Sequence, residues 1–319
     1  MHVADALLAS GRAVLGIDNL NDYYAVKLKR DRVAHLAERH GGLFAFRECD
    51  FADLAALHNA VDGHGVTSII HLGAQAGVRY SIENPHAYVQ SNLVGHVNML
   101  ELARQRSVAH LVYASSSSVY GGNASLPFRV EDRADHPVSL YAATKKADEL
   151  MSETYAHLYR TPQTGLRFFT VYGPWGRPDM AMWIFTKKIL AGEPIPVFNH
   201  GKMQRDFTYI DDIVAGVIAA HDHPPVDDGA EKAGGSRSPH RIYNIGNHRS
   251  EELMRLIEVL QDACGKKAVL DMRPMQPGDV PATYADITAI AGDLGFAPTT
   301  SIEEGVPRFV SWYRRYTND

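Results

Sequence analysis

Short apolar runs alternate with longer amphipathic stretches along the first half of the chain. The apolar runs predict strands buried on both faces at residues 13–18, 43–49, 67–72, 110–115 and 165–171. The stretches at residues 24–40, 85–105 and 140–159 have helical periodicity. This alternation predicts an α/β fold, built on a Rossmann-type doubly wound parallel sheet with helices on both faces.

The pattern of apolar runs and helical stretches changes after Gly173. Prolines and glycines divide the following region into shorter pieces, which predicts a domain boundary there. We therefore expect a first domain at residues 1–175 and a smaller α/β lobe at residues 176–319. Residues 224–239 are rich in Pro, Asp, Gly and Ser, and they predict an exposed loop.

The beginning of the chain does not match this plan. Residues 1–10 read as a helix that Gly11 stops, with no strand before it and no glycines at its start. A doubly wound domain opens with a strand and a Gly-rich turn, whose amides and following helix hold a diphosphate. About a dozen residues of strand plus turn are therefore expected to be missing.

Composition and charge narrow the function classes. The chain has 319 residues, of which 45% are hydrophobic and 22% charged, and its net charge of -5 argues against a general nucleic-acid binder. No apolar run has membrane-spanning length, and the first residues do not resemble a signal peptide. Cys49 and Cys264 are far apart, and no two histidines at metal-ligand spacing are accompanied by a second signal of a metal site. We expect a cytoplasmic protein without a metal, a nucleic-acid partner or a membrane partner.

The most specific chemical signal is Tyr141 and Lys145 on the predicted helix 140–159. At a spacing of four residues the two side chains lie on one helix face, where the lysine ammonium favours the phenolate form of the tyrosine. Such pairs are also common on exposed helices without any function. The serines at residues 115–118 follow a predicted strand, where open α/β sheets place ligands, although a serine run alone is also typical of a polar loop. The combination favours a redox site on a nicotinamide cofactor.

Acidic residues close two of the predicted strands. Asp18 is placed to accept hydrogen bonds from an adenosine ribose, or else to cap the following helix together with Asn19 and Asp22. Asp50 follows the next strand and is expected near the adenine. The small residues of the turn at 71–75 allow the backbone to approach a cofactor closely.

With these residues in view, the chain resembles a known family over nearly its whole length. It is similar to the extended short-chain dehydrogenase/reductases of the NAD-dependent nucleotide-sugar epimerase/dehydratase group, and within that group to the UDP-glucuronate 4-epimerases. The motifs that carry the resemblance are residues 18–24, 76–81, 115–121, 141–145, 167–174, 205–212 and 275–279.

The resemblance implies a mechanism and a set of contacts. Tyr141 would take the sugar 4-hydroxyl proton, Lys145 would hold the ribose, and Ser116 would hydrogen-bond the reacting oxygen, with hydride passing to NAD and back. The implied cofactor contacts are Asp18, Asn19, Asp50, Phe51, Leu72, Gly73, Ala74, Gln75, Asn92, Tyr141, Lys145 and Val171. The implied substrate contacts are Arg79, Ser117, Ser118, Thr170, Arg177, Val197, Phe198, Arg205, Gln276 and Asp279. Residues 176–319 would be the nucleotide-sugar-binding domain, and relatives are commonly dimers.

Charge bears on the choice of substrate. The related 4,6-dehydratases carry an acidic pair just after the serine, whereas this chain has Ser117 and Ser118, which cannot act as an acid/base pair. These hydroxyls, with Thr170 and Arg177, are expected to meet a sugar carboxylate. A solvated loop charge is the alternative reading of Arg177.

The family also opens with a strand and Gly-x-x-Gly-x-x-Gly, and residues 1–4 match the helix directly after the last of these glycines. We expect either a start codon assigned too late or a genuine truncation. Three functions therefore stay open: an isomerase of the 5.1.3 type acting on UDP-glucuronate, another nucleotide-sugar epimerase or dehydratase, and an inactive remnant that only binds a nucleotide sugar or a partner.

Overall fold

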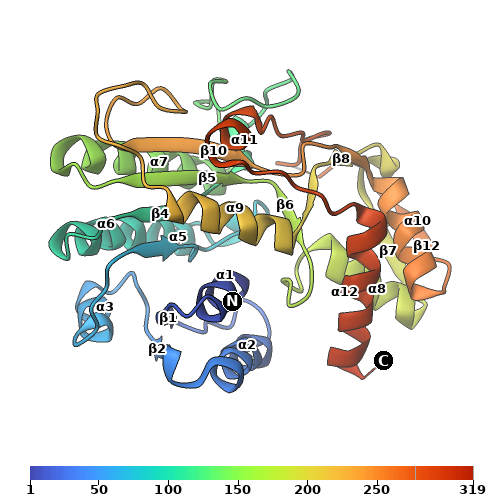
Figure 1. Ribbon diagram of the computed structural model, residues 1–319. Helices are drawn as coiled ribbons and strands as arrows, with labels where there is room; N and C mark the ends of the chain where they lie inside the picture. The colour runs from blue at the N-terminus through green and yellow to red at the C-terminus, as the bar shows by residue number, and fades with distance from the viewer. Residues whose placement is uncertain (277, 319) are drawn as a thin grey trace.

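The centre of the molecule is a four-stranded parallel sheet (Figure 1). The computed structural model describes residues 1–276 and 278–318. The strand order is β10-β5-β4-β3, with bounds β3 (Ile69–His71), β4 (Leu111–Ser116), β5 (Gln163–Phe168) and β10 (His240–Ile245). Strand β10 is buried throughout, and its polar side chains have partners inside the fold: His240 contacts the Tyr113 hydroxyl, and Asn244 donates to the carbonyl oxygen of Phe128. The predicted α/β fold with a parallel sheet is confirmed.

Two further strands form a separate parallel pair. Strand β1 (Val14–Asp18) pairs in register with β2 (Phe44–Glu48), and within the described residues neither strand pairs with the four-stranded sheet. Residues 14–17 of β1 are only half-buried, whereas β4 is buried almost throughout. In a doubly wound sheet the opening strand lies between these two strands, so the break between β1 and β3 agrees with the predicted absence of that strand. Figure 1 shows the β1–β2 pair below the main sheet, with α1 (His2–Ala9) beside it.

Helices cover both faces of the main sheet. Leu111 of β4 packs with α6 (Gly95–Gln105) and α7 (Leu140–Tyr159), while its neighbour Val112 packs with α9 (Ile210–Asp222). Successive strand residues point to opposite faces, so α6 and α7 lie on one face and α9 lies on the other. The remaining helices of this part are α2 (Val26–His40), α3 (Leu54–Val61), α4 (Tyr80–Glu83), α5 (Pro85–Tyr88) and α11 (Thr288–Leu294).

The predicted helix at residues 85–105 contains an irregular segment. Helix α5 is followed by a π-helical turn, η2 (Val89–Val94), before α6 begins. A π-turn widens the helix by one residue and frequently marks a functional site. The predicted strand 165–171 is also divided, since β5 ends at Phe168 and β6 (Thr170–Tyr172) pairs instead with β9 (Phe207–Tyr209).

A smaller lobe lies at the carboxyl side of the sheet. Its core joins the apolar faces of α8 (Ala181–Ala191), α10 (Leu253–Cys264) and α12 (Ile302–Thr317). Its strands are β7 (Pro194–Val197) with β12 (Val269–Met272), and β8 (Gln204–Arg205) with β11 (Glu251–Glu252). Residues 224–239 hold no helix or strand, in agreement with the predicted loop. The chain beyond residue 175 returns to the main sheet at β10, and the boundary at 175/176 stays a prediction.

Candidate active site

Helix α7 places Tyr141 and Lys145 across the carboxyl end of β4. The helix begins at Ser139, whose hydroxyl accepts a hydrogen bond from the backbone amide of Ala142 and so fixes the first turn. Lys145 is 3% exposed, and its Nζ donates to the carbonyl oxygen of Ala114 at 2.9 Å. The lysine is therefore held against the strand that ends in the serine run, and Tyr141 lies one turn earlier on the same helix.

The serine run turns the chain at the end of that strand. Ser116 ends β4 and its Oγ accepts from the backbone amide of Ser118 at 3.2 Å, which starts a short 3₁₀ turn, η3 (Ser117–Tyr120). Ser116 Oγ also donates to Ser118 Oγ at 3.0 Å. These contacts fix the direction of two hydroxyls, those of Ser116 and Ser118, at the carboxyl end of the sheet, beside the helix that carries Tyr141.

A buried ion pair, which the sequence analysis missed, holds α7 and the serine turn in place. The Arg167 guanidinium of β5 meets the Glu149 carboxylate of α7 with two contacts, of 2.8 and 2.9 Å, and also donates to Tyr120 Oη at 2.9 Å. Burial alone would raise the pKa of Glu149, but Arg167 lowers it to about 2. Ser115 Oγ donates to the same carboxylate at 2.7 Å. The pair joins α7, β5 and the serine turn.

Asn92 connects the cofactor side of the predicted site with the catalytic helix. This residue lies in the π-turn and is 2% exposed. Its amide accepts from Gln75 N at 2.8 Å, and donates to Gln75 O at 3.0 Å and to Thr144 Oγ1 at 3.0 Å. Asn92 thus fixes the loop after β3 relative to α7, and Thr144 is a participant that the sequence analysis missed.

Acidic groups gather at the carboxyl ends of β1 and β2. Asp18 is exposed and accepts from Leu20 N at 2.7 Å, while Asn19 Nδ2 donates to Asp50 Oδ2 at 3.2 Å. The two strands are parallel neighbours, so the residues that follow them meet at one edge. Carboxylates are suited to accept from ribose hydroxyls.

The described residues fit the two ends of a dinucleotide. Acceptors for an adenosine ribose follow β1 and β2, and the Lys145 ammonium lies at the other end, on α7. Between these ends, Gly73 lets the Phe51 ring pack against the backbone of the loop after β3, because a Cβ there would lie 2.8 Å from that ring. A Gly-rich turn for the diphosphate is not formed by the described residues, and the sheet is interrupted at that place.

A cavity of about 150 Å³ brings together five of the predicted substrate contacts. Its lining includes Ser117, Ser118, Thr170, Arg205 and Asp279. These residues come from η3, β6, β8 and the loop after β12, so they are distant in the sequence and meet only in the fold.

Positive charge dominates one side of this cavity. Arg79 donates to the Asp279 carboxylate at 3.2 Å and its guanidinium lies 4.7 Å from the centre of the Phe198 ring. Burial, together with the charge of Arg79 and against that of Asp279, lowers the pKa of Arg205. Two guanidinium groups face one carboxylate, and the remaining charge suits a diphosphate.

Other predicted substrate contacts lie outside the cavity lining. Arg177 binds Asp179, with Nε–Oδ1 at 3.0 Å and Nη2–Oδ2 at 2.5 Å, a counter-ion that the sequence analysis missed. Tyr23 donates to the same carboxylate, and burial together with Asp179 raises the pKa of Tyr23 to about 12. Val197 is buried in β7. Gln276 Oε1 has no hydrogen-bond partner within the described residues, and Pro277 of the same motif lies outside them.

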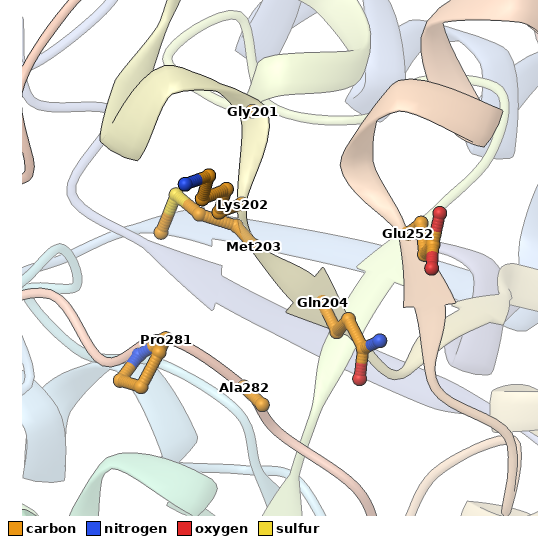
Figure 2. Close-up of a pocket in the computed structure, with 7 residues that line it drawn as sticks. All are labelled: Gly201, Lys202, Met203, Gln204, Glu252, Pro281 and Ala282. Carbon is orange, nitrogen blue, oxygen red and sulfur yellow. The ribbon is translucent and has the colours of Figure 1, made fainter.

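A larger cavity of about 430 Å³ lies next to β8 and β11 (Figure 2). Its polar lining is Lys202, Gln204 and Glu252, and it contains none of the predicted catalytic residues.

Within residues 1–276 and 278–318 no helix is long and apolar enough to cross a membrane, and no cluster of His, Cys, Asp and Glu could hold a metal ion.

Curated proteins of similar sequence include several that are named UDP-glucuronate 4-epimerases. The chain is 49% identical to a probable UDP-glucuronate 4-epimerase of Rhizobium meliloti, over 98% of this chain and 93% of that protein. It is 46% identical to UDP-glucuronate 4-epimerase 2 of Arabidopsis thaliana, over 99% of this chain and 73% of that protein.

Solved structures of similar fold carry the cofactor and nucleotide sugars. A UDP-glucuronic acid 4-epimerase of Bacillus cereus, in complex with UDP-glucuronic acid and NAD, matches with a TM-score of 0.85 and 29% identity. The match covers 99% of this chain and 95% of that chain. A UDP-glucose 4-epimerase of Thermotoga maritima with UDP-glucose also matches with a TM-score of 0.85, at 27% identity over 99% of this chain and 95% of that one.

The family model described as the NAD dependent epimerase/dehydratase family matches residues 1–246, which is more than half of the chain. Together with the full-length relatives and the Tyr141/Lys145 helix, this match settles the membership. The chain belongs to the NAD-dependent epimerase/dehydratase family.

Proposed function

We propose that the protein interconverts UDP-glucuronate and UDP-galacturonate by NAD-dependent epimerisation at C4. The observation that carries this proposal is the cavity in which neutral Ser117 and Ser118 face Thr170 and Arg205, next to the helix of Tyr141. The two positions after Ser116, where the related dehydratases carry an acidic pair to eliminate water, hold Ser117 and Ser118. The relatives of 46–49% identity that are named UDP-glucuronate 4-epimerases support the same substrate.

Three side chains would carry the chemistry. Tyr141 takes the proton of the sugar 4-hydroxyl and returns it, Ser116 hydrogen-bonds the reacting oxygen, and the Lys145 ammonium stabilises the phenolate and holds a ribose. NAD, when bound, supplies a temporary acceptor for the C4 hydride. Asp18, Asn19 and Asp50 would hold the adenosine end, while Asn92 keeps the loop of residues 72–75 in place.

Recognition of the nucleotide sugar is divided between two groups of residues. Arg79 and Arg205 would meet the diphosphate, with Phe198, Asp279 and Gln276 around the nucleoside. Ser117, Ser118, Thr170 and Arg177 would meet the sugar carboxylate. On this assignment, residues 1–175 bind NAD and residues 176–319 bind most of the nucleotide sugar.

We expect UDP-glucuronate to be epimerised with a kcat/KM about 100-fold higher than UDP-glucose, because a charge-assisted pair with Arg177 is formed only by the carboxylate. Arg177→Ala should remove most of this preference by lowering the value for UDP-glucuronate alone. The measurement is the initial rate with each sugar, and Arg237→Ala, in the exposed loop, is the matched control. Equal rates on both sugars in the unmodified enzyme would move the assignment to a UDP-glucose epimerase.

We propose in addition that the protein is a homodimer through α7 and the π-turn next to it. Exposed apolar side chains gather on these elements: Leu150 is 59% and Leu158 60% exposed, and Val89 and Val94 are also exposed. A row of apolar residues on two adjacent helices is typical of a helical interface.

Leu150→Glu combined with Leu158→Glu should convert a dimer into a monomer, because two charges would be buried at each copy of the contact. Sedimentation velocity gives the mass, and Val226→Glu, at an exposed apolar residue of the 224–239 loop, should leave it unchanged. A monomeric unmodified protein would refute the dimer.

Both cysteines are buried and unpaired, which agrees with a proposed location in the reducing cytoplasm.

A further inference from the structure

Asp148 is a buried acid in direct contact with the catalytic lysine. It lies three residues beyond Lys145 on α7, is 1% exposed, and its Oδ2 accepts from Lys145 Nζ at 3.1 Å. Its second oxygen, Oδ1, has no hydrogen-bond partner within the described residues. Burial of a carboxylate with an unpaired oxygen lowers the stability of the folded state, so the side chain of Asp148 lowers the stability of the fold.

Several titratable side chains surround this carboxylate. They are Lys145 and Glu149 on α7, His96 on α6, His71 on β3, Tyr113 on β4 and, behind Tyr113, His240 on β10. Arg177 and Tyr88 face Tyr141 at the start of the same helix.

Lys145 is the cation that balances Asp148. Burial, followed by the charge of Lys145, lowers the pKa of His71 to about 3, and burial lowers that of His96 well below its usual range, so both rings are neutral near pH 7. The charge of Glu149 is matched by Arg167. Asp148 and Lys145 therefore form a pair of opposite charges next to Tyr141.

We propose that Asp148 is a positioning residue of the epimerase, which holds the Lys145 ammonium at the end of β4 and limits by its negative charge the support that this ammonium gives to the Tyr141 phenolate. Both effects follow from one contact: the carboxylate fixes the Nζ atom opposite the Ala114 carbonyl, and it offsets the positive field that reaches the phenol. The inference rests on the proposed role of Tyr141 as the base.

The charge of Asp148 also changes within the working range. Burial raises the pKa of Asp148 to about 6, although Lys145 opposes this shift. Above pH 6 the carboxylate is charged and offsets Lys145. Below pH 6 it becomes neutral, and the ammonium then supports the phenolate fully.

The test replaces the charge and keeps the shape. In Asp148→Asn an amide oxygen can still accept from Lys145 Nζ, but the negative charge is lost, so the midpoint of Tyr141 ionisation should fall by about one pH unit. The midpoint is measured by NMR on the full chain carrying tyrosine labelled with carbon-13 at Cζ, with Tyr141→Phe to identify the resonance. This readout needs neither substrate nor turnover.

Matched variants separate the outcomes. Glu153→Gln removes a charge from the same helix about 18 Å from Tyr141 along the axis, and should not move the midpoint. Asp148→Leu, which removes both charge and anchor, should lower the midpoint and reduce turnover as well. A midpoint that is unchanged in both Asp148 variants would overturn the proposal. Failure of the epimerase assignment would appear instead as turnover by Tyr141→Phe.

Discussion

Tyr141→Phe should reduce epimerisation by about a thousandfold or more, while the nucleotide sugar binds with nearly unchanged affinity. The variant loses the proposed proton acceptor for the sugar 4-hydroxyl and keeps the ring, whose centre lies 6.0 Å from that of the Tyr88 ring. The proposed substrate contacts of Arg205 and the serine turn are untouched. The loss should therefore appear in kcat, with little change in the dissociation constant.

The measurement is turnover of UDP-glucuronate together with calorimetric titration of the nucleotide sugar. Tyr159→Phe removes a hydroxyl from the same helix at a half-exposed residue and should be fully active. Near-normal epimerisation by Tyr141→Phe would exclude Tyr141 as the base. Loss of binding in parallel with turnover would point to a structural role for its hydroxyl instead.

The interrupted sheet gives the second large effect. Expressed as residues 1–319, the protein should be poorly soluble or free of NAD, because β1 and β3 each have an edge that no described strand covers. Backbone amides left unpaired in the interior are costly, and a diphosphate has no glycine turn to bind. The half-buried residues of β1 agree with such an edge.

Extension of the chain by one strand and a Gly-x-x-Gly-x-x-Gly turn before Met1 should restore a cooperative thermal melt and tightly held NAD. The new strand would pair with both β1 and β3 and so join the two sheets into one. A matched extension with alanine for each glycine should restore the melt but not the cofactor. Released nicotinamide nucleotide is assayed after denaturation. Residues 1–319 with a cooperative melt and stoichiometric NAD would contradict this expectation.

The features that the sequence predicted are those set by local geometry. The four-residue spacing of Tyr141 and Lys145 fixes one helix face in any α-helix. The acids after β1 and β2 meet because parallel strands end at the same edge of a sheet. Ser116 ends β4 and therefore lies at the same edge, where α7 begins. The absence of an opening strand in the sequence predicted that the sheet would be interrupted between β1 and β3.

The features that the sequence did not predict depend on contacts between distant elements. Glu149 and Arg167 pair across a helix and a strand, and neither residue type signals the other. The π-turn around Asn92 was hidden because one extra residue hardly disturbs the periodicity of a long helix. The Asp179 counter-ion of Arg177 is set by a loop conformation that no periodicity encodes. The place of β10 beside β5 is likewise decided by long-range packing.

The interleaved path of the chain after β6 restricts how the lobes can move. The chain enters the smaller lobe with α8, returns to the main core with α9, and enters the smaller lobe again with α10. It then returns with α11, whose Ile290 packs in the main core, and ends in the smaller lobe with α12, whose Phe309 packs there. A hinge closes easily when one or two linkers bend, but here every crossing would have to bend together. We therefore expect substrate binding to be accompanied by movements of loops and side chains, and not by rotation of one lobe relative to the other.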